Sequence, residues 1–280
     1  MNKRILLTAT MLLFIWNLYS EKLLLVSDTY KEMNNFLAFD NSEKVAYTFP
    51  SSIQIAATGH LGNSMLVGKD RTSVVVITKS GLAAKSIPEK FREYFSIKIN
   101  DLGDVALSTT DGKKSQIYVS RFSEKAFRLV VDEIDDFLAV DTFTDSSIVF
   151  QHIIGRRSLF SRFDVSTGAK EILFDRPGYQ FCSYGDGRLF VSRGGSLFMV
   201  STGGVVRKER FEWDLGNYRL RYYSEGLSVL EENETNSVFI LRANQARVNL
   251  SDVYKSQHGA LAFFGVIDSD CMKNVINYLR

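Results

Sequence analysis

Residues 137–174 read FLAVDTFTDSSIVFQHIIGRRSLFSRFDVSTGAKEILF. Four short runs with alternating apolar residues, FLAVDTF, SIVFQHII, LFSRFDV and KEILF, are separated by turns that contain Asp, Ser, Thr and Gly. Alternating runs with turns of this composition are typical of strands that are joined by hairpins. The stretch therefore predicts one four-stranded antiparallel sheet.

The same pattern of a polar turn followed by an apolar strand recurs along the chain. The turns fall near residues 22, 62, 103, 146, 187 and 226, at steps of 40, 41, 43, 41 and 39. A period of about 40 in an all-strand chain is the signature of propeller blades. Complete blades are predicted over residues 53–87, 95–131, 137–174, 179–211 and 218–249.

The two ends of the chain complement each other. Residues 22–28, 35–41 and 44–49 supply three strands without an innermost partner, and residues 260–267 form a single strand whose next turn, at 268, keeps the period. Pairing these segments closes the ring and removes its free edges. The predicted fold is all-β, a six-bladed β-propeller of four-stranded antiparallel blades, closed by pairing of the C-terminal strand with the three N-terminal strands.

The N-terminal segment has the features of a secretory signal. Residues 1–4 are basic, residues 5–16 are apolar, and Ser20 is a small residue before a cleavage point. We therefore expect a signal at 1–20 and one propeller domain at 21–280, located in the periplasm or secreted. The alternatives are an uncleaved anchor and a strand at 11–19, which would leave a seventh partial blade. The segment is short for a membrane span, so no stable span is expected after signal removal.

The short C-terminal tail, residues 269–280, predicts one helix capped by Ser269 or Asp270. The residues that would share its apolar face are Met272, Val275, Ile276 and Leu279. The alternative is one more strand at the ring closure. Export would permit a disulfide between Cys182 and Cys271, but two unpaired thiols are the preferred interpretation, because pairing cannot be deduced from sequence alone.

One turn carries a resemblance to known families. Residues 163–168 read FDVSTG, and this Asp-x-x-Thr-Gly turn resembles the turn between outer strands in many bacterial propellers, including TolB-like and quinoprotein-like families. The resemblance implies a TolB-like or WD40-like repeat architecture over nearly the whole chain. No specific family motif set is present, since the Trp-Asp ending of WD40 blades and the sialidase box are absent. The resemblance therefore implies an architecture and no activity.

The residue types associated with catalysis and metal binding are sparse. The three histidines, His60, His152 and His258, fall in different blades and at different depths, which argues against a shared metal site. The motifs G-x-S-x-G and H-E-x-x-H and a phosphate loop are absent. We predict no catalytic residue, no metal and no cofactor. A net charge of +2 also argues against nucleic acid as a partner.

The segments that join one blade to the next should lie together around the channel, and loops on a rigid scaffold commonly carry binding sites. The candidate binding residues in these segments are Arg92, Asp132, Asp135, Asp136, Arg176, Tyr179, Trp213, Asp214 and His258. The acidic run at 132–136 is interpreted as a solvated loop, because it lacks the Asn and Gly spacing of a calcium loop.

These observations favour an exported scaffold that binds another protein in the cell envelope or outside the cell. One alternative is a hydrolase or lyase with a site at the channel mouth, which would require Asp132 or Asp136, His258 and Arg176 to converge. Another is a structural subunit of an envelope machine, which a broad apolar patch on one rim would favour.

Overall fold

The structure of the chain is a computed structural model. It describes residues 22–30, 33–68, 73–88, 94–110, 115–133, 137–154, 157–185, 188–201, 204–209, 217–224, 227–235, 237–242, 247–255 and 260–280. The predicted signal at residues 1–20 lies outside the described residues and stays a prediction. Within the described part of the chain, neither helix has the length and apolar character needed to cross a membrane.

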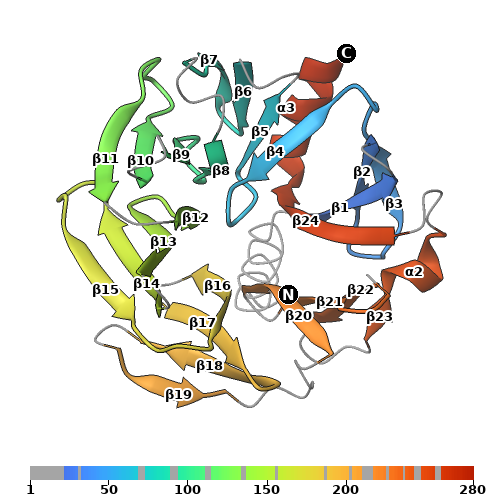
Figure 1. The fold of residues 1–280 in the computed structure, drawn as a ribbon. Coiled ribbons are helices and arrows are strands. Elements are labelled where there is room, and N and C mark those ends of the chain that lie inside the picture. The colour runs from blue at the N-terminus through green and yellow to red at the C-terminus, as the bar shows by residue number, and fades with distance from the viewer. Residues whose placement is uncertain are drawn as a thin grey trace, which may run out of the picture.

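Six four-stranded antiparallel sheets surround a central channel (Figure 1). Named in chain order and read from the innermost strand outward, blade 1 is β24-β1-β2-β3, and blades 2 to 6 are β4–β7, β8–β11, β12–β15, β16–β19 and β20–β23. The all-β, six-bladed prediction is confirmed.

The strand bounds of blades 1 to 3 are β24 (Ala260–Asp268), β1 (Lys22–Tyr30), β2 (Met33–Phe39), β3 (Val45–Thr48), β4 (Gln54–Thr58), β5 (Ser64–Gly68), β6 (Ser73–Thr78), β7 (Gly81–Ser86), β8 (Tyr94–Ile99), β9 (Val105–Thr110), β10 (Ser115–Ser120) and β11 (Arg128–Glu133). Those of blades 4 to 6 are β12 (Phe137–Phe143), β13 (Ser147–Ile154), β14 (Arg157–Asp164), β15 (Lys170–Phe174), β16 (Gln180–Gly185), β17 (Arg188–Arg193), β18 (Ser196–Val200), β19 (Val206–Lys208), β20 (Tyr218–Ser224), β21 (Leu227–Glu232), β22 (Val238–Arg242) and β23 (Val248–Asn249).

The ring closes by pairing of the two ends of the described chain. Strand β24 runs antiparallel to β1, with a register that extends from Lys22 opposite Asp268 to Thr29 opposite Ala260. The predicted exchange, in which the C-terminus supplies the innermost strand of the N-terminal blade, is confirmed.

Apolar packing between blades forms the core. Strand β5 is buried at all five positions, because neighbouring blades cover both faces of the sheet. One buried cluster joins Leu24 and Phe39 of blade 1 to Val229 and Ile240 of blade 6. Sheets that are covered on both faces read as near-continuous apolar runs, which explains why the strands stand out so clearly in the sequence.

The recurring polar turns hold neighbouring blades together. The Asp101 carboxylate, in the first turn of blade 3, accepts the backbone N–H groups of Leu61 and Asn63 in the first turn of blade 2, each at 2.9 Å. The Asp268 N–H donates to the Gly62 carbonyl at 2.8 Å. Gly62 has a φ of +81°, and a Cβ there would lie 2.8 Å from the backbone of residue 268. The sequence period therefore marks a contact between blades as well as a turn within each blade.

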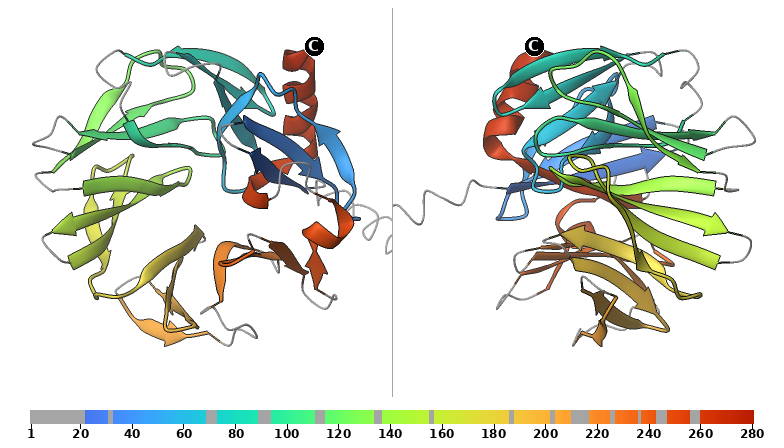
Figure 2. Two further views of the ribbon diagram at one scale, coloured as in Figure 1. Left: turned by 45° about the vertical axis from the view of Figure 1, so that its right-hand side comes forward. Right: turned by 90° about the vertical axis from the view of Figure 1, so that its left-hand side faces the viewer.

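The C-terminal tail is the predicted helix, α3 (Ser269–Leu279), and the strand alternative is wrong. Its cap is Asp268, whose carboxylate accepts the Asp270 N–H, so neither Ser269 nor Asp270 is the cap. The predicted apolar face packs on the core between blades 1 and 2, and α3 lies at one face of the ring (Figure 2). A short helix, α2 (Leu250–Val253), lies within a segment that was expected to be a loop.

Two local predictions are also confirmed. Cys182 and Cys271 are buried, unpaired thiols. In the Asp-x-x-Thr-Gly turn, the Asp164 carboxylate accepts the N–H groups of Ser166 and Thr167 at 2.9 and 2.8 Å, and Gly168 has a φ of +73°. A hydrogen bond from the Ser166 hydroxyl at 2.5 Å, together with these N–H groups, lowers the pKa of Asp164 to about 2.

Candidate functional site

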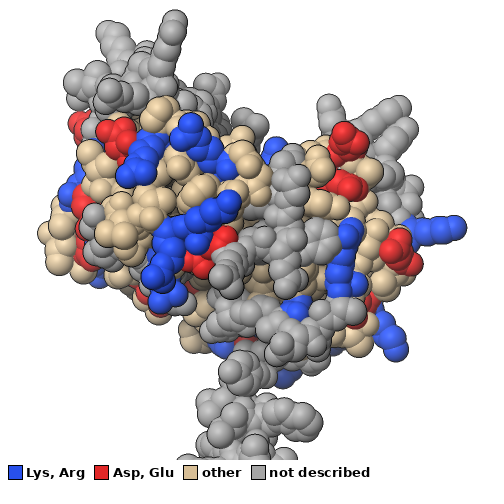
Figure 3. Space-filling model, turned by 90° about the horizontal axis from the view of Figure 1, so that it is seen from below, with Lys and Arg blue, Asp and Glu red and all other residues tan. Residues whose placement is uncertain are grey.

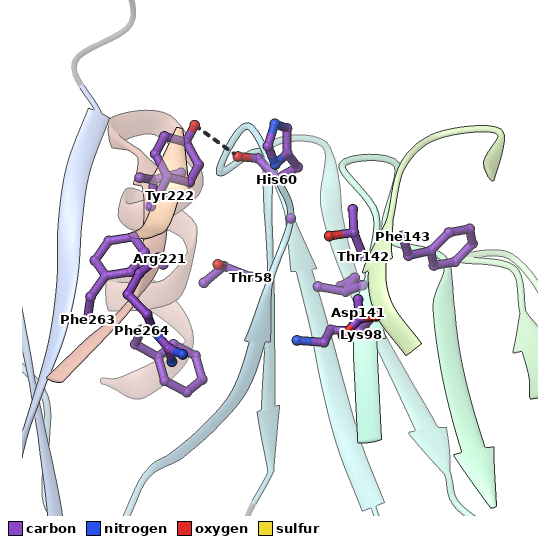
Figure 4. Close-up of a pocket in the computed structure, with 14 residues that line it drawn as sticks. Thr58, His60, Lys98, Asp141, Thr142, Phe143, Arg221, Tyr222, Phe263 and Phe264 are labelled. Atoms are coloured by element: carbon purple, nitrogen blue, oxygen red, sulfur yellow. Dashed lines mark hydrogen bonds between the residues drawn. The ribbon is translucent and has the colours of Figure 1, made fainter. Parts of the chain in front are cut away.

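A pocket of about 110 Å³ lies in the central channel, toward the end of the innermost strands that carries the recurring turns. Five innermost strands, β4, β8, β12, β20 and β24, contribute to its wall. The polar side chains that line it are Thr58, His60, Lys98, Asp141, Thr142, Arg221 and Tyr222. Figure 4 shows Lys98 and Asp141 together on one wall and Arg221 on the wall facing them.

Bulges place two of the charged residues in this pocket. Asp141 is the extra residue of β12, between the pairs Val140–Phe150 and Thr142–Val149. Arg221 is the extra residue of β20, between the pairs Leu220–Leu230 and Tyr222–Val229. A bulge takes one residue out of the strand alternation and redirects its side chain. Asp141 and Arg221 can therefore face the channel without interrupting the apolar packing of their blades.

One oxygen of the Asp141 carboxyl lacks a hydrogen-bond partner. Two buried side-chain oxygens of the described residues make no hydrogen bond, Glu124 Oε2 and Asp141 Oδ2. Glu124 Oε2 still lies 3.5 Å from the Arg128 Nε. Burial raises the pKa of Asp141 to about 7, although the Lys98 charge opposes this rise.

Lys98 is the nearest cation to Asp141. Burial lowers its pKa, the Asp141 charge opposes that shift, and Arg221 adds to it. Both side chains keep some accessible surface, because they face the channel, while protein surrounds them elsewhere.

Arg221 is held from behind by Glu231 on the neighbouring strand. The Arg221 Nε lies 3.1 Å from the Glu231 Oε2, and the other oxygen of Glu231 accepts the Phe263 N–H at 2.7 Å. This pair orients the guanidinium and leaves its Nη groups for the pocket. Near the pocket's edge, the Tyr222 hydroxyl donates to the His60 carbonyl at 3.3 Å (Figure 4).

The structure describes three of the nine predicted binding residues. Asp132 lies in the outermost strand β11 and not in a loop, and its Oδ1 accepts from Gln116 Nε2 at 3.1 Å. Arg176 lies 5.9 Å from the Phe174 ring centroid, and Tyr179 packs edge-on against Phe174 at 4.9 Å. None of the three lines the channel pocket. The other predicted residues, Arg92, Asp135, Asp136, Trp213, Asp214 and His258, lie outside the described residues.

The predicted loop face does contain a second hollow. A groove of about 520 Å³ lies between blades 5 and 6, and Gly178, Gln180, Arg193, Tyr218, Arg219 and Asn233 are among the residues that line it. The Arg193 guanidinium lies 5.2 Å from the ring centroid of the predicted residue Tyr179. Figure 3, which views the ring from the side of blades 5 and 6, shows basic and acidic side chains interspersed.

No metal site is found within the described ranges, where no three His, Cys, Asp or Glu side chains gather. His152 is buried in β13, and its Nε2 lies 3.1 Å from the Ser161 hydroxyl. His60 lies in the turn after β4, as predicted.

Sequence reasoning missed Lys98, Asp141 and Arg221. The available signal was a charged residue inside an apolar innermost strand, as in YFSIKI, FLAVDTF and YRLRYY. The other four innermost strands carry an apolar residue or a thiol as the extra residue of their bulge, namely Ala56, Phe95, Cys182 and Phe264. The sequence could not show the bulges, so the charges read as outward-facing positions of half-exposed strands.

No family model and no curated protein matches this chain. Among solved structures, a putative TolB from Agrobacterium tumefaciens is similar with a TM-score of 0.55 and 12% identity, over 89% of this chain and 98% of that one. TolB from Acinetobacter baumannii has a TM-score of 0.52 and 12% identity, over 87% and 66%. A chain of a nidogen–laminin complex has a TM-score of 0.53 and 10% identity, over 88% and 97%. At these identities the similarity shows the propeller fold alone, and it confirms the predicted TolB-like repeat architecture.

Proposed function

We propose that this protein is an exported binding propeller that recognises another protein through a group that enters its central channel. The observation that carries the proposal is the Asp141 Oδ2, which is buried and has no hydrogen-bond partner among the described residues, in a pocket that Lys98 also lines. Leaving a buried polar group without a hydrogen bond costs about 1–3 kcal/mol. A partner that supplies the missing bond would recover part of that cost on binding.

The size of the pocket favours recognition of one side chain or chain end. A volume of about 110 Å³ is small beside the roughly 300–1,000 Å³ of typical ligand sites. The same fold occurs in a chain of a nidogen–laminin complex, so it is compatible with protein binding. The predicted signal at residues 1–20 supports a location in the envelope or outside the cell.

Affinity capture from the native envelope tests this proposal. The wild-type chain, Asp141→Leu, which removes the hydrogen-bonding group, and the surface control Asp132→Leu should be used as matched baits. We expect a stoichiometric partner with the wild type and with Asp132→Leu, and at least a tenfold weaker interaction of that purified partner with Asp141→Leu. Equal affinity for all three baits would show that the channel does not take part in recognition. The absence of any direct partner would refute protein binding.

An enzyme is the second candidate, because a carboxyl with a pKa of about 7 suits general acid–base catalysis near neutral pH. Asp141 would then be the acid or base of a hydrolase or lyase, with Lys98 and Arg221 binding an anionic part of the substrate. Turnover by the purified wild type of a saccharide or peptide substrate, lost in Asp141→Asn, would establish this function. Substrate binding without turnover would exclude it for that substrate.

A further inference from the structure

We infer that the group which the channel binds is a carboxylate, held between Lys98 and Arg221 and hydrogen-bonded to Asp141. This inference rests on the proposed function only in taking the channel pocket as the binding site. It concerns the chemistry of the bound group, which either a partner protein or a free organic acid could supply.

The balance of donors and acceptors supports an anionic ligand. Protonated Lys98 carries three N–H donors, and its side chain lines the pocket. Arg221 uses its Nε for Glu231 and keeps its Nη groups, and a guanidinium has a planar fork of donors that matches a carboxylate. Asp141 is the one carboxyl among the described residues that line the pocket. A ligand rich in hydrogen-bond acceptors therefore makes more hydrogen bonds with this wall of the pocket than a cation would.

The size and charge of the pocket favour a carboxylate over a larger or doubly charged anion. An apolar cavity of about 150 Å³ accommodates benzene, so a pocket of about 110 Å³ has room for a group of acetate size. Protonated Lys98 supplies one positive charge beyond that of Arg221, which Glu231 balances. Burial lowers the pKa of Lys98, and a bound anion favours its protonated form. One negative charge on the ligand completes the balance when Asp141 is neutral.

Asp141 makes this binding dependent on pH. Neutral Asp141 donates a hydrogen bond to the ligand, while ionised Asp141 repels it. Among the described residues that line the pocket with Asp141, the other charged or titratable ones are Lys98 from β8, Arg221 and Tyr222 from β20, and His60 from the turn after β4. If binding requires the neutral form, a pKa of about 7 weakens it about tenfold between pH 6 and pH 8.

Acetate is the direct probe, with acetamide as its neutral counterpart. Amide shifts in ¹⁵N NMR spectra should report acetate binding at Thr58, Asp141 and Thr142, with a Kd in the millimolar range expected for so small a ligand. We expect at least tenfold weaker binding of acetamide, and about tenfold weaker binding of acetate at pH 8 than at pH 6. Equal binding of acetamide, tighter binding of methylammonium, or no shifts up to about 0.5 M acetate would overturn the inference.

Variants assign the roles of the side chains. Lys98→Met should weaken acetate binding at least tenfold, whereas Lys208→Met, a matched change on the exposed end of β19, should leave it unchanged. Asp141→Asn should abolish the pH dependence. If the dependence persists in Asp141→Asn, it belongs to another group of the pocket, such as Lys98, whose pKa burial lowers, and the assigned role of Asp141 is wrong. The acetate–acetamide comparison uses the wild type alone, so it holds even if Lys98→Met does not fold.

Competition separates this inference from the proposed function. Acetate that displaces a captured protein shows that the partner supplies the carboxylate. Acetate binding without any protein partner supports the inference with a free acid as the ligand, and refutes protein binding. A captured protein that acetate and Lys98→Met leave undisturbed supports the proposed function and overturns the inference.

Discussion

Replacing Asp141 with Asn should stabilise the protein in a manner that depends on pH. The carboxyl has an ordinary pKa of 3.8 in the unfolded chain, and burial in the channel raises this pKa to about 7. Between these values the folded state holds a proton that the unfolded state has released. Stability contributed by this proton is present at low pH and is lost as the pH rises through 7. Asparagine has a similar size and does not ionise, so Asp141→Asn should not lose this stability as the pH rises.

The two pKa values set the size of the effect. Each unit of difference corresponds to about 1.4 kcal/mol, so the 3.8-to-7 shift costs the wild type about 1 kcal/mol at pH 4.5 and about 4 kcal/mol at pH 8. The stability of Asp141→Asn relative to the wild type should therefore grow by about 3 kcal/mol over this range. In a domain of this size that corresponds to a relative gain in Tm of roughly 6–12 °C.

Thermal melting by circular dichroism at pH 4.5, 6, 7 and 8 measures this growth. Asp132→Asn is the control, because Asp132 is exposed on β11, and its difference from the wild type should stay nearly constant with pH. The reasoning is refuted if the Asp141→Asn difference is also constant, or if it shrinks toward pH 8. Direct titration of the Asp141 carboxyl by ¹³C NMR should give the same pKa of about 7 in the folded protein.

Two further substitutions test the contacts between blades, and a labelling experiment tests the buried thiols. Lys85 is 2% exposed, and its Nζ donates to the Arg121 and Glu124 carbonyls at 2.6 and 2.7 Å. Lys85→Met should therefore lower the free energy of unfolding by about 2–3 kcal/mol, as measured by urea denaturation. An unchanged denaturation midpoint would contradict this role of Lys85. A Cβ on Gly265 would lie 2.1 Å from the Thr58 Oγ1, so Gly265→Ala should destabilise the fold by about 1–3 kcal/mol. Adding Thr58→Ala should restore most of the lost stability. Additive effects of the two changes would show that the two residues are not in contact. Burial raises the pKa of Cys182 to about 11 and that of Cys271 to about 12. Iodoacetamide at pH 8 should therefore label both thiols only after unfolding, as measured by mass spectrometry. Rapid labelling of the native chain would contradict their burial.

The fold could be predicted from the sequence because its determinants are local and repeated. Apolar runs and polar turns recur with the period of the blades, and the register of β24 on β1 follows from the strand that the N-terminal blade lacks. The cap of α3 was misplaced because Asp268, the last residue of β24, serves both elements. The channel site depends on one-residue bulges and on distances between blades, and neither is encoded by periodicity. Asp141 and Arg221 are 80 residues apart in the sequence and meet only when the ring closes.

The recurring turns and the bulges separate stability from recognition within each blade. The turns hold neighbouring blades through Asp101 and Gly62, so a change there should weaken the ring. Each innermost strand also carries one bulge against the next strand, and a bulged residue has no cross-strand partner to lose. Such a position can accept Asp141 in one blade and Arg221 in another without a change in the register of either sheet. The chemistry of the channel can therefore vary one blade at a time, while the period that specifies the fold stays intact.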